Sequence, residues 1–362
     1  MKLLFLADST RTHTIKYLQY FYEKGYEIEL ITPTPFQELD INVHLILNCQ
    51  KSNGALKKYW YLKKAAEVKK IIQRIQPDLL HALFVTNFGF LGAYSQFHPL
   101  IVTAYGPDIL ITPPKNISFR FMTKYCLQHA DLINSVAPPI TDAILKMNIN
   151  PKKIFTFKYF VDLDRFNFAV KHKAETSGRY TVLGIEHPDN NSNLKTLIKA
   201  IPIVLSYLKN VWFIFLCSRP TQAQLKNLAS ELKVAEHVAF PDVLSESKIF
   251  HYFQMADIYI SIPEVDGMPQ SLLEAMACGI FPIVSNIPAY QIFIKDGIDG
   301  FCVAPKQHKI IAQKIIEALE NPDLRQEAAK SNLNKMQKLP SFEKNLELLE
   351  YEYMKLIKKT TV

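Results

Sequence analysis

Residues 256–289, ADIYISIPEVDGMPQSLLEAMACGIFPIVSNIPA, decide the fold of the chain. Two short apolar runs in this stretch, 258–262 and 280–284, have the length and composition of buried strands. Between them the pattern predicts a polar loop over 263–270 and a helix over 271–277, which a glycine ends. A strand, a loop, a helix and a second strand form a βαβ unit, which predicts a parallel sheet covered by helices.

The loop before the predicted helix is the part of this unit where a ligand is expected. Ligands of open α/β sheets bind in the loops that leave the carboxyl ends of strands. The free N–H groups at a helix N-terminus favour an anion. Asp266 and Glu274 flank the helix start, with seven residues between them. Because carboxylates accept hydrogen bonds from hydroxyl groups while amides hold phosphate, this pattern is typical of a sugar-nucleotide pocket.

Local structure offers a second interpretation of the same residues. Ser271 and Glu274 have the S-x-x-E spacing of a helix capping box, and Asp266 with Gly267 is an ordinary turn pair. Without their surroundings these residues would need no ligand. The strand before them and the DGIDG loop at 296–300 favour the pocket.

Length and composition predict about two globular domains and an anionic partner. The chain has 362 residues, 48% hydrophobic and 21% charged, with a formal net charge of +8. Charge alone does not distinguish nucleic acid, an anionic membrane, a phosphorylated substrate and an inert basic surface. The five cysteines have no CxxC pair and no zinc spacing, which is typical of a reducing compartment. No run is long enough to span a membrane, so we expect a cytoplasmic protein with at most peripheral contact on the inner membrane face.

The alternation of apolar runs and helical patterns occurs twice along the chain. The first series starts with a strand over 2–7 and predicts a Rossmann-like domain over 1–168, although its first loop lacks the GxGxxG dinucleotide fingerprint. The polar stretch 171–179 is the best linker candidate, and a second series predicts a Rossmann-like domain over 169–340. An amphipathic helix in 341–362 is expected to pack back toward the first domain. Ligand sites are common between two such domains, so the predicted site is the cleft between them.

A lysine-rich helix is predicted over 56–76. A solvated helix face explains its charges, and a footing on anionic lipid head groups is the alternative. The basic residues that would contact the lipid are Lys57, Lys58, Lys63 and Lys64.

The segment DGMPQSLLEAMACG, residues 266–279, closely resembles the donor-binding signature of retaining glycosyltransferases of family 4. Further segments fit the same family, among them TAYGPDIL at 103–110, HADLINSVAPPITDAI at 129–144 and FVDLDRF at 160–166. The resemblance covers nearly the whole chain. It implies the α/β GT-B fold, two facing Rossmann-like doubly wound domains with a nucleotide sugar in the inter-domain cleft, held mainly by the second domain.

The resemblance also assigns roles to residues of the loop and helix. It implies that Glu274 accepts hydrogen bonds from the ribose hydroxyls of the nucleotide and that Asp266 binds hydroxyls of the donor sugar. These two are the predicted catalytic residues. The rest of the predicted donor-binding segment is Gly267, Met268, Pro269, Gln270 and Ser271, in which the proline has no N–H to offer.

The chain departs from the family at the basic pair that holds the diphosphate. An Arg is usual just after the first strand of the second domain, where this chain has Ile185-Glu186-His187. The later Lys position corresponds to Ser192. A charge-assisted hydrogen bond to phosphate contributes about 1.5–3 kcal/mol, so other groups are expected to replace the pair. The candidates are His187, Lys195, Arg219 and Arg11.

On the acceptor side, the family often has a His where this chain has Tyr105. A tyrosine can donate one hydrogen bond to a sugar hydroxyl. Gly106 allows close approach, and Asp108 is expected to hold an acceptor hydroxyl. Three further residues are expected in strand-end loops that face the same cleft, His13, His81 and Asn87, with a locally bonded loop residue as the alternative for each His.

These observations predict a retaining glycosyltransferase that moves a sugar from a UDP- or GDP-linked donor to a glycan or lipid-linked acceptor in surface polysaccharide biosynthesis. The resemblance implies a front-face displacement in which the leaving phosphate takes the acceptor proton, so no protein base, metal ion or cofactor is expected. The alternative is a non-catalytic GT-B-fold binding or partner subunit, which the missing Arg/Lys pair suggests. Nucleic acid is not expected as a partner, because the basic residues are not interleaved with stacking aromatic residues.

Overall fold

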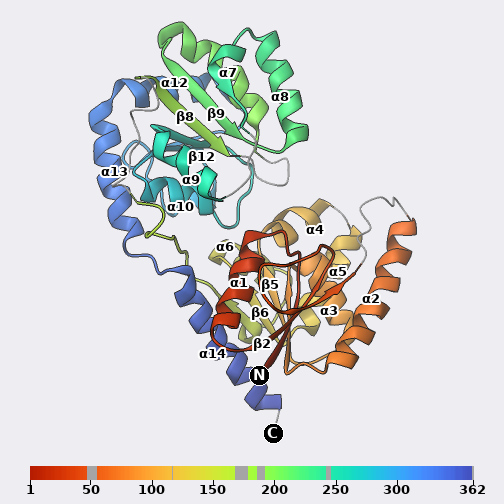
Figure 1. The fold of residues 1–362 in the computed structure, drawn as a ribbon. Helices are drawn as coiled ribbons and strands as arrows, with labels where there is room; N and C mark the ends of the chain where they lie inside the picture. Colours follow the sequence, from red (N-terminus) through yellow and green to blue (C-terminus); the bar gives the residue numbers. More distant parts are fainter. Residues whose placement is uncertain (47–54, 116, 168–177, 186–191, 242–245, 361–362) are drawn as a thin grey trace. The chain divides into compact units, whose positions relative to one another are not determined.

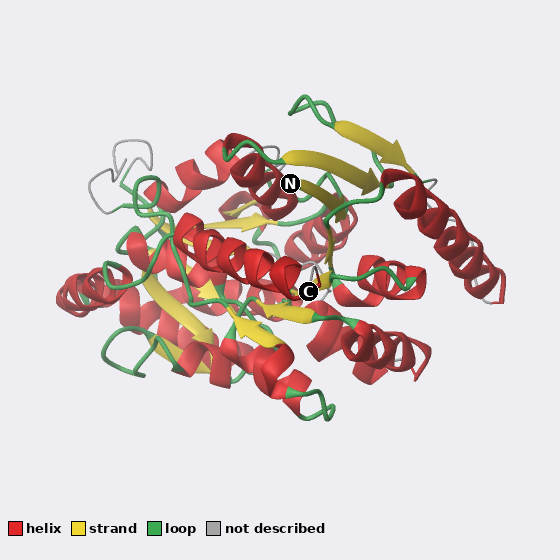
Figure 2. Cartoon of the chain, turned by 90° about the horizontal axis from the view of Figure 1, so that it is seen from below, coloured by secondary structure: helices red, strands yellow, loops and turns green. Residues whose placement is uncertain are grey.

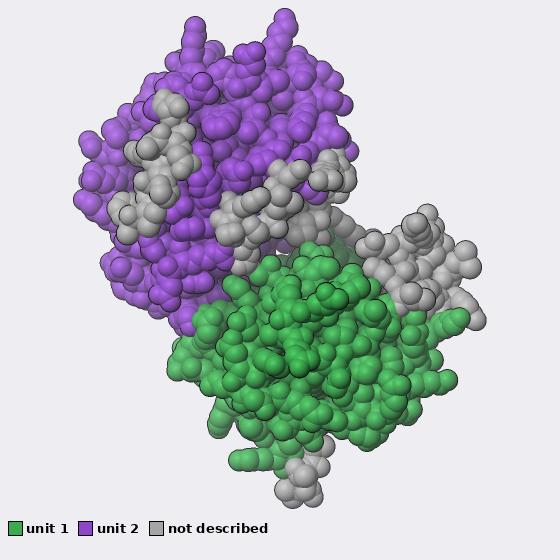
Figure 3. All heavy atoms as spheres, viewed as in Figure 1, with its two compact units in different colours: residues 1–159, 342–362 green, residues 160–341 purple. Residues whose placement is uncertain are grey.

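The computed structural model describes residues 1–46, 55–115, 117–167, 178–185, 192–241 and 246–360 (Figure 1). The chain forms two compact units (Figure 3). Unit 1 comprises Met1–Tyr159 together with Phe342–Val362, and unit 2 comprises Phe160–Ser341. The division lies a few residues before the predicted boundary at 168, and the predicted linker 171–179 lies mostly outside the described residues.

Unit 1 is built on a parallel sheet of seven strands in the order β3-β2-β1-β4-β5-β6-β7. The strands are β1 (Lys2–Leu6), β2 (Glu27–Thr32), β3 (Asn42–Leu45), β4 (Leu79–Leu83), β5 (Leu100–Ala104), β6 (Leu132–Ser135) and β7 (Ile154–Thr156). β4 and β5 consist of residues that are all buried, because helices cover both faces of the sheet. This burial explains why the strands read as continuous apolar runs in the sequence.

Helices lie on both faces of the sheet of unit 1 (Figure 2). They are α1 (Thr12–Glu23), α2 (Ala55–Ile75), η1 (Val85–Gly89), α3 (Phe90–Ser95), η2 (Pro107–Ile111), α4 (Thr112–Lys115), α5 (Ile117–His129), α6 (Pro138–Leu145), η3 (Pro151–Lys153) and α14 (Phe342–Thr360). The chain leaves β1 toward β2 but leaves β4 toward β5 on the other side. Because parallel crossovers are right-handed, α1 covers one face while α2, α3 and α5 cover the other.

Unit 2 repeats this plan with a parallel sheet of six strands in the order β10-β9-β8-β11-β12-β13. The strands are β8 (Tyr180–Ile185), β9 (Val211–Leu216), β10 (Val238–Ala239), β11 (Ile258–Ser261), β12 (Phe281–Ser285) and β13 (Phe301–Val303). The helices are α7 (Leu194–Tyr207), α8 (Arg219–Glu231), η5 (Ala235–His237), α9 (Glu246–Met255), α10 (Gln270–Ala277), α11 (Pro288–Gln291), α12 (His308–Glu320) and α13 (Pro322–Met336). The prediction of two Rossmann-like α/β domains is confirmed.

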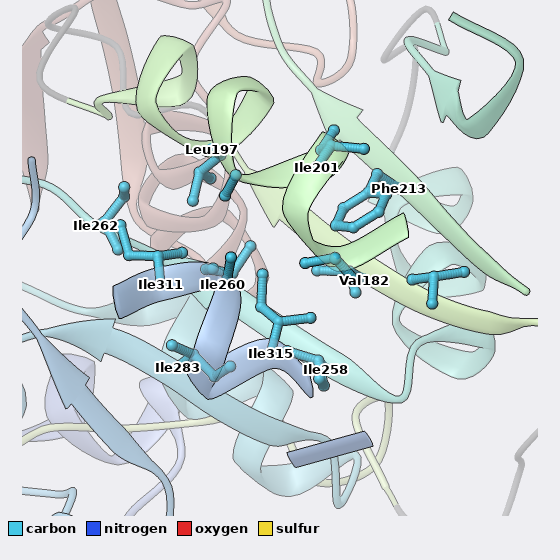
Figure 4. Packing of buried hydrophobic residues seen from close by; sticks show 14 of the residues in the cluster. Val182, Leu197, Ile201, Phe213, Ile258, Ile260, Ile262, Ile283, Ile311 and Ile315 are labelled. Carbon is cyan, nitrogen blue, oxygen red and sulfur yellow. The ribbon is translucent and has the colours of Figure 1, made fainter. Parts of the chain in front are cut away.

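The core of unit 2 lies between its sheet and the helices α7 and α12 (Figure 4). Leu197 and Ile201 of α7 and Ile315 of α12 meet the β-branched side chains of the central strands, such as Ile260 and Val182. Each of these side chains is almost fully removed from water. This packed layer gives the loops at the carboxyl ends of β8 and β11 a rigid base.

The C-terminal helix α14 packs on unit 1. Asn345 exchanges two hydrogen bonds of 3.0 Å with the backbone of Lys158, and Glu350 accepts one from Tyr20 at 2.8 Å. Farther along the helix, the ring of Tyr353 stacks on that of Phe21 with centroids 5.0 Å apart. The chain therefore returns from unit 2 to complete the side of unit 1 that carries α1.

The expectation that His81 lies in a strand-end loop is wrong. His81 is in the middle of β4 and is fully buried. Its Nε2 lies 2.7 Å from Thr103 Oγ1, and its Nδ1 is hydrogen bonded to the hydroxyl of Tyr353. β4 is paired on both edges and covered on both faces, so this imidazole fastens α14 to the sheet and has no path to a ligand.

His81 should make the stability of unit 1 depend on pH. Burial lowers the pKa of His81 to about 3, well below the ordinary value of 6.5. Below pH 6.5 the imidazole of His81 is protonated in the unfolded chain but stays neutral in the folded chain, so the free energy of unfolding falls as pH falls. One such group changes it by up to about 1.4 kcal/mol per pH unit. Between pH 7 and pH 5, we expect the free energy of unfolding of His81→Gln to fall by about 1–2 kcal/mol less than that of the parent chain.

Urea titrations of the full chain at several pH values would measure this difference, with His129→Gln, which removes an exposed imidazole, as the matched control. Comparing variant with parent removes the contributions of His13, whose pKa is lowered to about 4, and of Asp108, whose pKa is raised to about 6. Parallel pH profiles for the His81 variant and its parent would contradict the assignment.

The basic face predicted for the lysine-rich helix needs a correction. Lys64 is buried and its ammonium is paired with Glu67, because Ala65, Val68 and Ile72 turn this side of α2 toward the core. Lys63 is exposed, whereas the side chains of Lys57 and Lys58 lie outside the described part of the chain. None of the helices in the described residues has the length and apolar composition to cross a membrane.

Candidate active site

The candidate site of unit 2 lies where its sheet changes direction. β8 and β11 are neighbours in the sheet, but the chain leaves β8 toward β9 and leaves β11 toward β12, on opposite sides. The carboxyl ends of these two strands therefore form a topological switch point, which is the usual ligand position in such sheets. Asn193, the N-cap of α7, donates its Nδ2–H to the carbonyl of Ile262 at 2.9 Å and so links the start of this helix to the residue that follows β11.

Hydrogen bonds fix the loop over residues 262–269 that follows β11. Ser285 Oγ donates to the carbonyl of Pro263 at 2.5 Å, and Lys306 Nζ lies 2.6 Å from Glu264 Oε1. Within the loop, the N–H of Gln270 donates to the carbonyl of Met268 at 2.8 Å. Gly267 and Pro269 are buried, so the loop presents its side chains from a backbone that is held in place.

The capping-box interpretation of Ser271 and Glu274 is wrong. α10 starts at Gln270 with Pro269 at the N-cap, so Ser271 is already inside the helix. Its hydroxyl lies 2.7 Å from the hydroxyl of Tyr259, a fully buried residue of β11. Glu274 instead accepts a hydrogen bond from Nε2 of Gln270, one turn earlier on α10, at 3.1 Å. Local capping therefore does not explain the carboxylate of Glu274.

Asp266 is oriented by a tyrosine that sequence reasoning missed. The hydroxyl of Tyr290 donates to Asp266 Oδ2 at 3.0 Å and lies 2.9 Å from Oγ of Ser261 at the end of β11. Tyr290 is fully buried, and burial followed by the charge of Asp266 raises the pKa of its hydroxyl well above 10. The phenol therefore stays protonated and keeps donating to the carboxylate. A tyrosine in the short segment PAYQ carries no pattern that would reveal this role.

The loop and α10 together present a polar surface of two carboxylates and one carboxamide. Asp266, Gln270 and Glu274 are each half-buried, and hydrogen bonds hold all three. A half-buried carboxylate that is already oriented gains most from a ligand with adjacent hydroxyl groups, because each hydroxyl donates one charge-assisted bond. The surface thus has the chemistry to bind a polyhydroxylated ligand such as a sugar or a ribose.

The candidate basic residues are placed unevenly. Lys195 is exposed in the first turn of α7, the helix that follows β8. Arg219 begins α8, but its side chain and the whole of His187 lie outside the described residues. Arg11 belongs to unit 1, where its Nε lies 3.6 Å from Asp8. Ser192, at the usual position of a Lys, is buried.

In unit 1, most of the predicted acceptor residues follow the carboxyl ends of β1, β4 and β5, but His13 lies in the first turn of α1 and Asn87 in η1, rather than in the predicted loops. The rings of His13 and Tyr105 contact each other, with centroids 4.2 Å apart. Burial, helped by the charge of Arg11, lowers the pKa of His13 to about 4, so its imidazole is neutral at pH 7. Asn87 is half-buried in η1 after β4.

Two of the acceptor-side expectations are corrected by the positions of the polar atoms. The hydroxyl of Tyr105 is buried inside unit 1 and cannot donate to a sugar. Asp108 is also fully buried, and its carboxylate accepts hydrogen bonds from the backbone N–H groups of Val85 at 2.7 Å and Gly106 at 2.9 Å. It joins the loops after β4 and β5 rather than holding an acceptor hydroxyl. Gly106 has φ +120°, a backbone conformation that side chains rarely adopt.

Comparison with known proteins agrees with this division into units. Residues 2–137 match the family model of glycosyl transferase 4-like proteins. Residues 167–335, which include the Asp266 loop and α10, match the family model of glycosyl transferases group 1. The two matched segments fall in the two units and together cover most of the chain.

Individual proteins resemble the chain over nearly its full length. An uncharacterized glycosyltransferase of Methanocaldococcus jannaschii is 23% identical over 320 residues, 83% of this chain and 82% of the relative. Sucrose-phosphate synthase from Thermosynechococcus elongatus has a similar structure, with a TM-score of 0.82, 15% identity and coverage of 99% of this chain and 100% of that chain. Anabaena HepE, solved in complex with UDP and glucose, has a TM-score of 0.77 at 16% identity, with 98% of this chain and 100% of that chain covered.

Proposed function

The chain belongs to the group 1 glycosyltransferases with the GT-B fold, and we propose that it transfers a sugar, with retention of configuration, from a nucleotide sugar to a glycan or lipid-linked acceptor. The observation that carries this proposal is the pair of oriented carboxylates, Asp266 and Glu274, at the switch point of unit 2. We place the reaction in the synthesis of a surface polysaccharide.

In the proposed complex the two carboxylates hold different parts of the donor. Glu274, on α10, accepts hydrogen bonds from the hydroxyls of the nucleotide ribose, and Asp266 accepts them from hydroxyls of the sugar. Asp266 lies in the loop between β11 and α10, whereas Glu274 is one turn into the helix. We assign Lys195 to the diphosphate. It is the candidate basic side chain of unit 2 within the described residues, and it is exposed at the start of α7.

The proposed reaction is a displacement on the face of the sugar from which the phosphate leaves. The acceptor oxygen forms a bond to the anomeric carbon while the bond to the phosphate oxygen breaks, and the acceptor proton passes to the leaving phosphate. The protein's part is to position the reactants and to stabilise the charge on the diphosphate. The neutral imidazole of His13 and the backbone at Gly106 are the polar groups of unit 1 that we assign to the acceptor.

A thermal-shift screen of the full chain against UDP- and GDP-linked sugars tests the proposal. A donor present at a hundred times its dissociation constant stabilises the folded chain by about 2.7 kcal/mol. We expect stabilisation by one nucleotide class and transfer or slow hydrolysis of the same donor, detected as released nucleoside diphosphate. If none of the donors stabilises the chain and none is hydrolysed, the proposal is wrong.

The role of Tyr290 gives a separate prediction about the donor. Tyr290→Phe removes the hydrogen bond to Asp266 and lets its carboxylate rotate, so we expect the KM for the donor to rise about five- to tenfold. The matched control is Tyr259→Phe, which removes a second buried tyrosine hydroxyl, on β11, but leaves the partner of Asp266 in place. It should share the small loss of stability without the rise in KM. Equal kinetic changes in the two variants would show that Tyr290 acts only on packing.

A further inference from the structure

Helix α5 has an outward face that combines large apolar and basic side chains. Ile117 is 86% exposed and Phe121 is 69% exposed, and Arg120 and Lys124 are exposed between and after them. The spacing of these four residues places them on one side of the helix. We call them the α5 surface. Single exposed apolar residues are ordinary, but two on adjacent turns flanked by two cations form a patch.

The α5 surface is not a displaced part of the core. The opposite side of the helix supplies the buried residues Thr123, Cys126 and Leu127, so α5 already has a side that packs on the core of unit 1. A row of rings extends the patch over the surface of unit 1: Phe121 to Tyr125 at 6.5 Å, then Tyr125 to Phe90 of α3 at 5.8 Å. Aromatic side chains that offer one apolar side and one polar edge are typical of membrane–water interfaces.

The charge of the patch indicates which surface it fits. Residues 117–129, ISFRFMTKYCLQH, contain no acidic side chain, and the chain as a whole has a formal charge of +8. Apolar side chains that enter the acyl region beside cations that remain among anionic head groups are the usual pattern of helices that lie on membranes. A bilayer supplies both environments at once, whereas an acidic protein would also have to present a matching apolar pocket for Ile117 and Phe121.

The position of the α5 surface relates it to the acceptor residues of the same unit. The N–H of Asp131, just after α5, donates to the carbonyl of Leu100 at 2.9 Å, so the helix ends where β5 begins. The first turns of α5 must then lie toward the other end of β5, where Gly106 follows the strand and His13 contacts Tyr105.

We propose that the α5 surface docks unit 1 on an anionic lipid bilayer, with Ile117 and Phe121 inserted and Arg120 and Lys124 at the head groups. This inference rests on the proposed function, because a lipid-linked acceptor would then emerge from the bilayer at the edge that holds His13 and Gly106. It transfers the membrane contact from the lysines of α2, of which Lys64 is buried, to α5.

Sedimentation of the full chain with phosphatidylcholine vesicles, with and without phosphatidylglycerol, tests the proposal. We expect binding to the anionic vesicles that added salt weakens. Ile117→Ser with Phe121→Ser should lower the vesicle partition coefficient at least about tenfold. Arg120→Gln with Lys124→Gln should lower it about fivefold or more and reduce its dependence on salt.

Matched controls come from unit 2. Tyr207→Ser removes a side chain that is 72% exposed, and Lys309→Gln with Lys330→Gln removes two exposed cations. Equal losses in these controls, equal binding to neutral vesicles or no binding by the parent chain would overturn the proposal. A change of oligomeric state in the α5 variants without a change in vesicle binding would assign the patch to a second copy of the chain. Donor stabilisation is measured separately, so failure of vesicle binding with donor binding intact refutes this inference and leaves the proposed function standing.

Discussion

Glu274→Gln is expected to lower kcat/KM for the nucleotide sugar by about 30- to 150-fold. The variant keeps the size and the acceptor oxygen of the side chain but loses its charge. Each of the two ribose hydroxyls then donates to a neutral group, and the difference is about 1–1.5 kcal/mol per hydrogen bond. Two such bonds contribute about 2–3 kcal/mol, which corresponds to the stated range at about 1.4 kcal/mol per factor of ten.

The geometry around Glu274 makes this variant a clean test. Gln270 Nε2 donates to Glu274 Oε1 at 3.1 Å, and a glutamine oxygen can accept the same bond, so the start of α10 should keep its structure. Steady-state kinetics and calorimetric donor binding measure the change.

The matched control is Glu264→Gln, in the same loop. Glu264 is half exposed and paired with Lys306, so removal of its charge should change stability and kinetics by less than about 1 kcal/mol. If Glu264→Gln reduces turnover as strongly as Glu274→Gln, the effect is the loss of loop charge and not a contact with the ribose. Unchanged kinetics in Glu274→Gln would remove this residue from the site.

The sequence was sufficient to predict the elements of this site, because each rests on a local pattern. The apolar runs became β11 and β12, and the helix between them begins within one residue of the predicted start. The switch point follows from two βαβ series, since their doubly wound arrangement leaves only a few strand orders. Neither conclusion requires knowledge of a distant contact.

Three of the differences between prediction and structure have the opposite character, because they involve residues from separate elements of the chain. The sequence predicts His81 as an acceptor-side residue, but its partner is Tyr353, which follows it by 272 residues. The sequence predicts that Asp108 holds an acceptor hydroxyl, but its carboxylate accepts a hydrogen bond from the N–H of Val85, in η1 after β4. The hydroxyl of Tyr290 donates to Asp266, 24 residues earlier in the chain, and no sequence spacing predicts that contact.

One error could have been avoided with the sequence alone. Both interpretations of the lysine-rich helix require Lys64 to be exposed, although Val68 and Ile72 follow it at helical spacing. That series marks the buried side of α2. There the methylene groups of Lys64 pack along the core, and its ammonium is paired with Glu67.

Lys335→Met is expected to lower the free energy of unfolding of unit 2 by about 2–3 kcal/mol. Asp299, 3% exposed, accepts from Lys335 Nζ at 2.5 Å and from Ser331 Oγ at 2.7 Å, both on α13. Burial would raise the pKa of Asp299, but these hydrogen bonds and the charge of Lys335 outweigh it, and the pKa is lowered. Removal of the cation leaves a buried carboxylate with part of its hydrogen bonding lost. A fully buried pair would cost about 3–5 kcal/mol, and the lysine, 35% exposed, reduces that figure.

The pH dependence and a double variant separate this ion pair from simple packing. A carboxylate with a lowered folded-state pKa stabilises the fold above its unfolded pKa of 3.8, and this stabilisation is lost as pH falls through the folded-state pKa. In Lys335→Met the unpaired Asp299 can accept a proton at a higher pH, so the penalty should shrink as the solution is acidified. Asp299→Asn with Lys335→Met should recover part of the loss, because the double variant has no buried charge. A penalty that does not change with pH and is not relieved in the double variant would show that only the packing of the lysine stem matters.

The same pair also bears on how the candidate site is supported. α13 packs against α10, the helix that carries Glu274, and Lys335 joins α13 to the carbonyl of Phe293 at 2.7 Å. If α13 only supports the fold, Lys335→Met should bind donor with the parent affinity at temperatures well below its lowered unfolding midpoint. The matched control Lys344→Met breaks an exposed pair with Glu347 on α14 and should cost less than about 0.5 kcal/mol. A weakened donor affinity in folded Lys335→Met would instead mean that α13 sets the position of α10, and hence of the ribose-binding carboxylate.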